Sequence, residues 1–75
     1  MINEHEQAIL TTILPDSSLL PGDIGTVVHI YEGNAAYEIE FFTVDGQTLD
    51  VVTVEATHVR PVDSHAVFHA RQMAA

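Results

Sequence analysis

The sequence predicts a mainly β fold, a small five-stranded barrel followed by a short C-terminal α-helix. Three observations lead to this prediction. The 75 residues are too few for two ordinary domains and can build only one modest core. Pro and Gly residues divide the chain into runs of about strand length. One run alternates apolar and acidic residues, as half-buried strands do. We therefore expect the barrel over residues 1–62 and an appended helix or tail over residues 63–75.

The first two strands are marked by their composition and by the residues that end or bend them. The first run is rich in β-branched side chains and ends where Pro15 lacks a backbone donor. The second carries apolar groups on both faces, and a bend or bulge near Gly25 would explain this, since a barrel strand must curve. The five predicted strands cover residues 7–14, 24–31, 37–41, 47–54 and 58–62.

The third strand has the clearest pattern. Its apolar residues Tyr37, Ile39 and Phe41 alternate with Glu38 and Glu40. A period of two places the apolar side chains on one face of a strand and the carboxylates on the other. We therefore expect the apolar set in the core and the acidic set outward.

The turn after this strand fixes how it pairs with the fourth. A two-residue loop at Asp45-Gly46 would place Phe41 opposite Asp50 and mismatch the two apolar faces. We therefore predict a three-residue turn with Gly46 at positive φ in a bulged hairpin. This turn would pair the two apolar faces, Ile39 and Phe41 with Leu49 and Val51.

The last part of the chain contains a short strand and a predicted helix. The strand over residues 58–62 would close the barrel against the first strand and remove open edges. After Pro61, Asp63 or Ser64 can cap a helix that runs through Arg71. About ten residues is marginal for an isolated helix. We therefore expect this helix to dock on the barrel or a partner, or to fray.

Four short motifs, taken in order, resemble the bacterial domain-of-unknown-function 4926 family. They are GDIGTVV (22–28), AYEIEF (36–41), DGQT (45–48) and VRP (59–61). The resemblance covers about residues 8–62. It implies a stand-alone SH3-like barrel and brings no established activity. It also implies a toxin and antitoxin or immunity pair, because such genes neighbour other small genes.

The charge balance limits the partners. Eleven Asp and Glu face only Arg60 and Arg71, and the formal net charge is −9. Nucleic-acid binding needs clustered cations that release counterions, so this class of partner is excluded. The same field accelerates encounter with a basic protein. Its simplest effect is solubility.

Other features narrow the location and the chemistry. No stretch approaches the roughly 18 apolar residues that span a membrane, and the first residues are acidic where a signal peptide is basic. We therefore expect a cytoplasmic protein that does not bind membranes. Cysteine is absent, which rules out a disulfide framework, a thiolate zinc site and a nucleophilic thiol.

The residues expected to bind a partner lie on the third and fourth strands. Glu38 and Glu40 share a strand face, and we expect Asp50 across from Glu40. Phe42, if outward, adds an aromatic ring beside these carboxylates, a surface suited to an arginine-containing partner. The alternative is a plain solvated face. Because the carboxylates have no accompanying pocket, we predict no enzyme activity and no cofactor.

Two histidines are weak metal candidates. His65 and His69 are spaced i to i+4, which puts both imidazoles on one face of a helix. A third ligand would have to come from Asp63 or His5, and structural zinc sites normally need four. Ordinary surface histidines are therefore the favoured interpretation.

The functional prediction is a non-catalytic module that binds a basic protein, with an antitoxin or immunity protein as its most specific form. One alternative is an accessory or stability subunit that docks through the C-terminal helix and its Phe68. Another is a DNA-mimicking inhibitor, which requires regularly spaced carboxylates. We also expect that the chain can associate with a second copy of itself, since a small barrel exposes much apolar surface.

Overall fold

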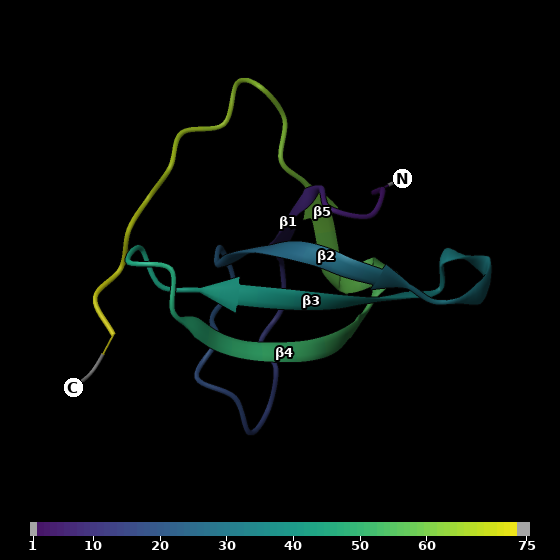
Figure 1. The fold of residues 1–75 in the computed structure, drawn as a ribbon, viewed down its shortest axis with the longest axis horizontal. Helices are drawn as coiled ribbons and strands as arrows, with labels where there is room; N and C mark the ends of the chain where they lie inside the picture. Colours follow the sequence, from purple (N-terminus) through teal and green to yellow (C-terminus); the bar gives the residue numbers. More distant parts are fainter. Residues whose placement is uncertain (1, 74–75) are drawn as a thin grey trace.

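The computed structural model describes residues 2–73, so the outer ends of both predicted segments, at residues 1 and 74–75, lie outside the described residues. Five antiparallel strands form one sheet in the order β4-β3-β2-β1-β5 (Figure 1). The mainly β prediction is confirmed. The strands are β1 (Gln7–Leu10), β2 (Ile24–Ile30), β3 (Ala36–Phe42), β4 (Thr48–Glu55) and β5 (Val59–Pro61).

Short helical turns join strands that are consecutive in the chain. One 3-10 turn, η1 (Glu32–Asn34), links β2 to β3, and another, η2 (Ala56–His58), links β4 to β5. The predicted pairing of the fifth strand with the first is confirmed, since Ile9 of β1 faces Arg60 of β5. β1 is shorter than predicted and ends at Leu10. The chain leaves the sheet there, although the Thr11 N–H still donates to the His58 carbonyl at 2.8 Å.

The core lies on one side of the sheet. Alternate residues of β3 point into it, β1 adds Ala8 and Leu10, and β2 and β4 add Val27 and Val54. Leu19, from the loop between β1 and β2, and Ile2, from the N-terminal segment, complete the cluster. The alternation predicted for the third strand is therefore confirmed, with Tyr37, Ile39 and Phe41 all buried.

The hairpin between β3 and β4 combines the predicted turn with an unpredicted bulge. The Thr43 N–H donates to the Gln47 carbonyl and the Gly46 N–H to the Thr43 carbonyl, each at 2.9 Å. These bonds enclose a three-residue turn with Gly46 at φ 89°, as predicted. The Thr43 hydroxyl also donates to Asp45 and lowers the pKa of that carboxyl below its usual value.

The predicted register beyond this turn is wrong. Phe42 pairs with Thr48, but Phe41 pairs with Asp50 and Ile39 with Val52. One extra residue, Leu49, therefore forms a bulge in β4. The bulge shifts the strand by one residue and undoes the matching that the odd turn would have imposed. A second register shift lies in β2 at Val28 and bends that strand three residues beyond Gly25.

The prediction of a helix after Pro61 is also wrong. Residues 62–73 form an extended tail with a single turn at its start. Asp63 does cap that turn: its carboxylate accepts the His65 N–H at 2.8 Å. The turn does not propagate, because nucleation is costly and the tail's Val67 and Phe68 stay largely exposed, so they bury too little surface to offset that cost. Within residues 2–73, no helix is long and apolar enough to cross a membrane.

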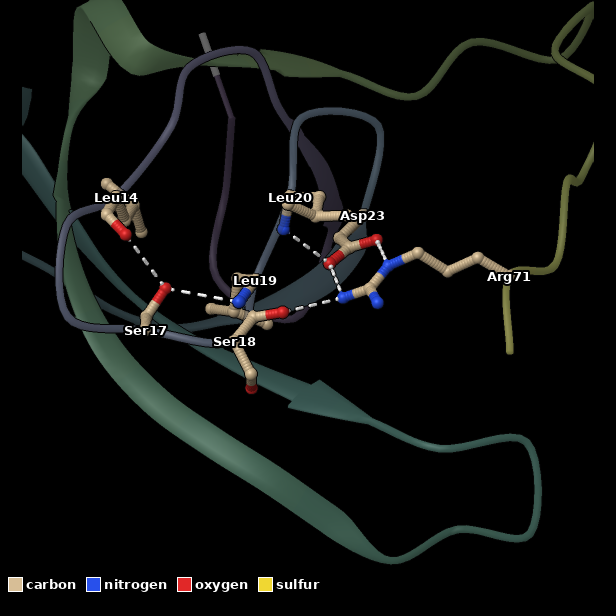
Figure 2. A network of polar contacts seen from close by, with 7 residues as sticks. All are labelled: Leu14, Ser17, Ser18, Leu19, Leu20, Asp23 and Arg71. Atoms are coloured by element: carbon tan, nitrogen blue, oxygen red, sulfur yellow. Dashed lines mark hydrogen bonds and ion pairs between the residues drawn. The ribbon is translucent and has the colours of Figure 1, made fainter. Parts of the chain in front are cut away.

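The tail returns to the sheet through Arg71. Its guanidinium binds both carboxylate oxygens of Asp23, at 2.8 and 2.7 Å, and donates to the Ser18 carbonyl at 2.9 Å (Figure 2). Asp23 also accepts the Leu20 N–H, so the loop between β1 and β2 presents a preorganised carboxylate. The tail is thus tied to that loop near its far end.

Candidate protein-binding face

The outward side of β3 and β4 forms a surface that we call the acidic face. It consists of Glu38, Glu40 and Phe42 on β3 and Thr48, Val51 and Thr53 on β4. The alternation of β3 produces it, because every side chain between the buried ones points away from the core. Phe42 and Val51 each keep 45% of their surface exposed. The sheet therefore presents two apolar side chains to solvent beside two carboxylates.

Cross-strand pairing places these groups next to one another. Glu40 stands opposite Val51, and Glu38 stands opposite Thr53. The Thr48 hydroxyl donates to the Glu40 carboxylate at 2.6 Å and orients it. Facing partners in an antiparallel pair have Cβ atoms about 5 Å apart, so each carboxylate directly borders a β4 side chain.

Strand β2 borders the other side of the acidic face. His29 pairs with Glu38, and Thr26 pairs with Glu40. The His29 and Tyr31 rings meet edge to face, with centroids 4.7 Å apart. Both side chains are exposed, so an aromatic pair lies next to the Glu38 carboxylate.

Asp50 lies elsewhere than predicted. The expected position across from Glu40 is wrong, because the Leu49 bulge moves Asp50 opposite Phe41. Its carboxylate accepts the N–H of Val51 at 2.9 Å. Asp50 is therefore half-buried and bound to the backbone of β4, while Glu38 and Glu40 form the predicted pair on one strand.

Phe68 lies at a different place from the acidic face. It is 76% exposed, and with Val67 it borders an open hollow of about 440 Å³ beside Ile24, Pro61 and Val62. The hollow lies between the tail and the strands β1, β2 and β5. The sequence predicts Phe68 as a docking residue of the C-terminal segment, and the structure places it at this second location, apart from Glu38, Glu40 and Phe42.

A family model described as Domain of unknown function (DUF4926) matches residues 4–61. This match covers more than half of the chain. The chain belongs to the DUF4926 family. Searches of curated proteins and of solved structures gave no match.

The DUF4926 match includes all five strands and therefore the whole acidic face. It ends at Pro61, the last residue of β5, so the tail lies beyond it. The acidic face is thus a feature of the DUF4926 domain itself, whereas Val67, Phe68 and Arg71 belong to the segment that follows.

The tail's histidines border a second hollow of the DUF4926 chain, together with Asp63. Among residues 2–73, no three His, Asp or Glu side chains gather closely enough to hold a metal ion. The i to i+4 geometry proposed for His65 and His69 required a helix, and that helix is not formed.

The polar contact that sequence reasoning missed is the Arg71–Asp23 pair. Donation from Arg71 lowers the pKa of Asp23, against a smaller opposing effect of burial, and the pairing raises the pKa of Arg71. The two residues are 48 positions apart, and no local pattern relates them. The scarcity of cations was the only available signal, since two arginines stand among eleven carboxylates.

Proposed function

We propose that this DUF4926 protein is a non-catalytic binding module, built as an SH3-like barrel, that engages a basic protein through its acidic face. One observation carries the proposal: Glu38 and Glu40 stand beside the exposed Phe42 and Val51 on one sheet surface. Interfaces combine exposed aromatic and aliphatic anchors with charges at their rim. An arginine side chain can satisfy both, because it pairs with carboxylates and stacks on aromatic rings.

The strand order supports the barrel part of this proposal. β1 lies between β2 and β5, and the short turn η2 carries the chain directly from β4 to β5. A five-stranded meander whose last strand returns to pair with its first is the arrangement expected of an SH3-like barrel.

The chain's charge supports a basic partner. A net charge of −9 produces a long-range field that accelerates association with a cationic surface. An antitoxin or immunity protein, whose task is to cover a basic partner quickly, is the most specific form of this proposal. The described residues of β2, β3 and β4 include no Lys or Arg that could pair with Glu38 and Glu40. A partner's cations would supply these missing pairs.

The test is affinity capture from the native host's lysate with tagged protein, washed at low and then at high salt. We expect a basic protein that is retained at low salt and lost at high salt. The double variant Glu38→Lys, Glu40→Lys should lose that protein. A matched control, Glu4→Lys, Glu32→Lys, changes the net charge equally at two exposed carboxylates outside the acidic face. Equal retention of the protein by both double variants would refute the assignment of the acidic face.

The tail provides a second candidate, docking as an accessory subunit of a larger complex. Val67 and Phe68 are 91% and 76% exposed, yet the Arg71 pair holds the far end of their segment in place. The full-length variant Val67→Ser, Phe68→Ser should lose a salt-resistant partner if this candidate is correct. Retention of every captured protein would refute it. DNA mimicry requires carboxylates that are regularly spaced over one surface, and β3 aligns only two. No specific observation favours this role, which stays a prediction.

A further inference from the structure

We propose that β4 accepts an extended strand of the basic partner along its open edge. This inference rests on the proposed function and specifies how the partner binds: by adding a sixth strand to the sheet beside the acidic face. Strand addition supplies affinity through backbone hydrogen bonds and specificity through alternate side chains.

The hydrogen-bond pattern of the β3–β4 pair shows which backbone groups point away from the sheet. The Ala56 N–H donates to the Ala35 carbonyl at 2.9 Å, and the register continues without a break to Phe41 and Asp50. In an antiparallel pair, bonded and non-bonded residue pairs alternate. Thr53, opposite Glu38, and Val51, opposite Glu40, are therefore in non-bonded pairs. Their N–H and carbonyl groups point outward.

These outward groups lie on a free edge. β4 is the last strand in the sheet order, and Figure 1 shows no strand beyond it. Both Thr53 and Val51 are exposed. Thr53 is in a non-bonded pair with Glu38, and among residues 2–73 no hydrogen bond from a turn or loop reaches its N–H or carbonyl. A solvent-exposed edge with unpaired peptide groups at alternate residues is a template for another strand.

Asp50 protects part of this edge. Its carboxylate occupies the Val51 N–H at 2.9 Å, so that donor is already satisfied in the free protein. An incoming carbonyl would displace the carboxylate. The released Asp50, on the opposite side of β4 from Glu38 and Glu40, would then be free to pair with a Lys or Arg that the incoming strand carries on that side. A basic strand therefore replaces one interaction with two, which a neutral strand cannot do.

Charge decides the occupant of the edge. β4 carries Asp50 and Glu55 and no cation, and Glu38 and Glu40 stand one strand away. A second copy of the chain would bring another net charge of −9 to the same edge. A partner strand would run about 5 Å from β4 and roughly 10 Å from β3. Lys or Arg at alternate positions can cross Val51 and Thr53 over that span to reach the β3 carboxylates.

The test uses two synthetic ten-residue peptides, one alternating Lys and Val and one alternating Lys and Pro. They carry equal charge, but only the first can form a strand ladder. Binding is measured by calorimetry at low salt. We expect the Lys-Val peptide to bind wild type at least about tenfold more tightly than the Lys-Pro peptide.

Variants at the edge separate strand addition from simple charge attraction. Thr53→Pro removes an outward N–H that β3 does not use, and edge strands tolerate Pro there. It should weaken Lys-Val binding about tenfold, while Thr53→Ala, which keeps the N–H, should bind like wild type. Asp50→Ala, whose Val51 N–H is unguarded, should bind the Lys-Val peptide without loss. If Thr53→Pro fails to fold, the comparison of the two peptides on wild type decides, since a Lys-Pro peptide that binds as tightly as the Lys-Val peptide would refute strand addition.

The outcomes distinguish this inference from the function on which it rests. If Thr53→Pro binds the Lys-Val peptide as wild type does while Glu38→Lys, Glu40→Lys loses it, strand addition is refuted and the acidic face stands. If the charge reversal also changes nothing, the proposed function fails with it. The oligomeric state is measured by sedimentation. If wild type is a dimer and Thr53→Pro is a monomer, a second copy of the chain occupies the edge, and the proposal of a basic partner strand is refuted.

Discussion

Replacing Gly25 with Ala tests the packing that supports the acidic face from behind. Gly25 lies in β2 opposite Phe41 and is buried. A Cβ atom there would stand 2.5 Å from Ile39 Cγ2, 2.9 Å from the Glu40 carbonyl oxygen and 3.0 Å from Phe41 Cδ2. The carbonyl belongs to the backbone of β3 and cannot rotate away. The glycine is therefore required by close approach of two strands.

The cost follows from the overpacking. An extra methylene forced into a well-packed core typically costs 1 to 3 kcal/mol, and a clash with backbone belongs at the upper end. Lower chain entropy in the unfolded state returns about 0.5 to 1 kcal/mol. We expect a net loss of about 2 to 2.5 kcal/mol. At roughly 4 to 8 °C per kcal/mol for a domain of this size, Tm should fall by about 8 to 20 °C.

The measurement is urea unfolding followed by circular dichroism, with Gly46→Ala as the matched control. A Cβ at Gly46 meets nothing within 4 Å, but its φ of 89° strains any other residue. That variant should lose only about 1 to 2 kcal/mol. A Gly25→Ala protein within 0.5 kcal/mol of wild type would show that β2 and β3 are not in close contact at this point, and the reasoning would be wrong.

Two further predictions concern the tail and the core. Because Arg71 lowers the pKa of Asp23, the folded state favours the carboxylate, and its stabilisation of the tail is present above the ordinary value of 3.8. It is lost as the pH falls through the lowered value, so amide exchange in residues 62–70 should accelerate there, and Asp23→Asn should accelerate it at neutral pH. Ile39→Ala, at a fully buried position, should cost about 2 to 5 kcal/mol in urea unfolding, whereas Val67→Ala in the exposed tail should cost under 0.5 kcal/mol.

The parts of the fold that were predicted correctly rest on short-range patterns. The period of two in β3 predicted which side chains are buried, because that alternation is imposed by the strand itself. Gly46 predicted the turn, because few residues adopt positive φ without strain. Both signals lie within a few residues and need no knowledge of the rest of the chain.

The failures required knowledge of tertiary packing. The Leu49 bulge depends on how β4 must bend to bury Leu49 and Val52 against the core, and no residue in the sequence marks it. The predicted helix failed for a related reason. Asp63 supplies a cap, but a cap contributes only about 1 kcal/mol and cannot sustain a helix whose apolar residues, Val67 and Phe68, stay largely exposed.

The candidate site, like the fold, was predictable where it depends on short-range patterns and not where it depends on strand register. Glu38, Glu40 and Phe42 share a face because they alternate along one strand, so local periodicity was sufficient. Asp50 belongs to the neighbouring strand, and its position depends on a register that the bulge displaces. Its carboxylate also accepts the N–H of the next residue, Val51, at the edge of the sheet. Asp50 thus guards the part of the backbone that a partner strand would need. Two separable interactions should therefore determine binding: charge reversal at Glu38 and Glu40 removes the ionic one, and Thr53→Pro removes a backbone hydrogen bond.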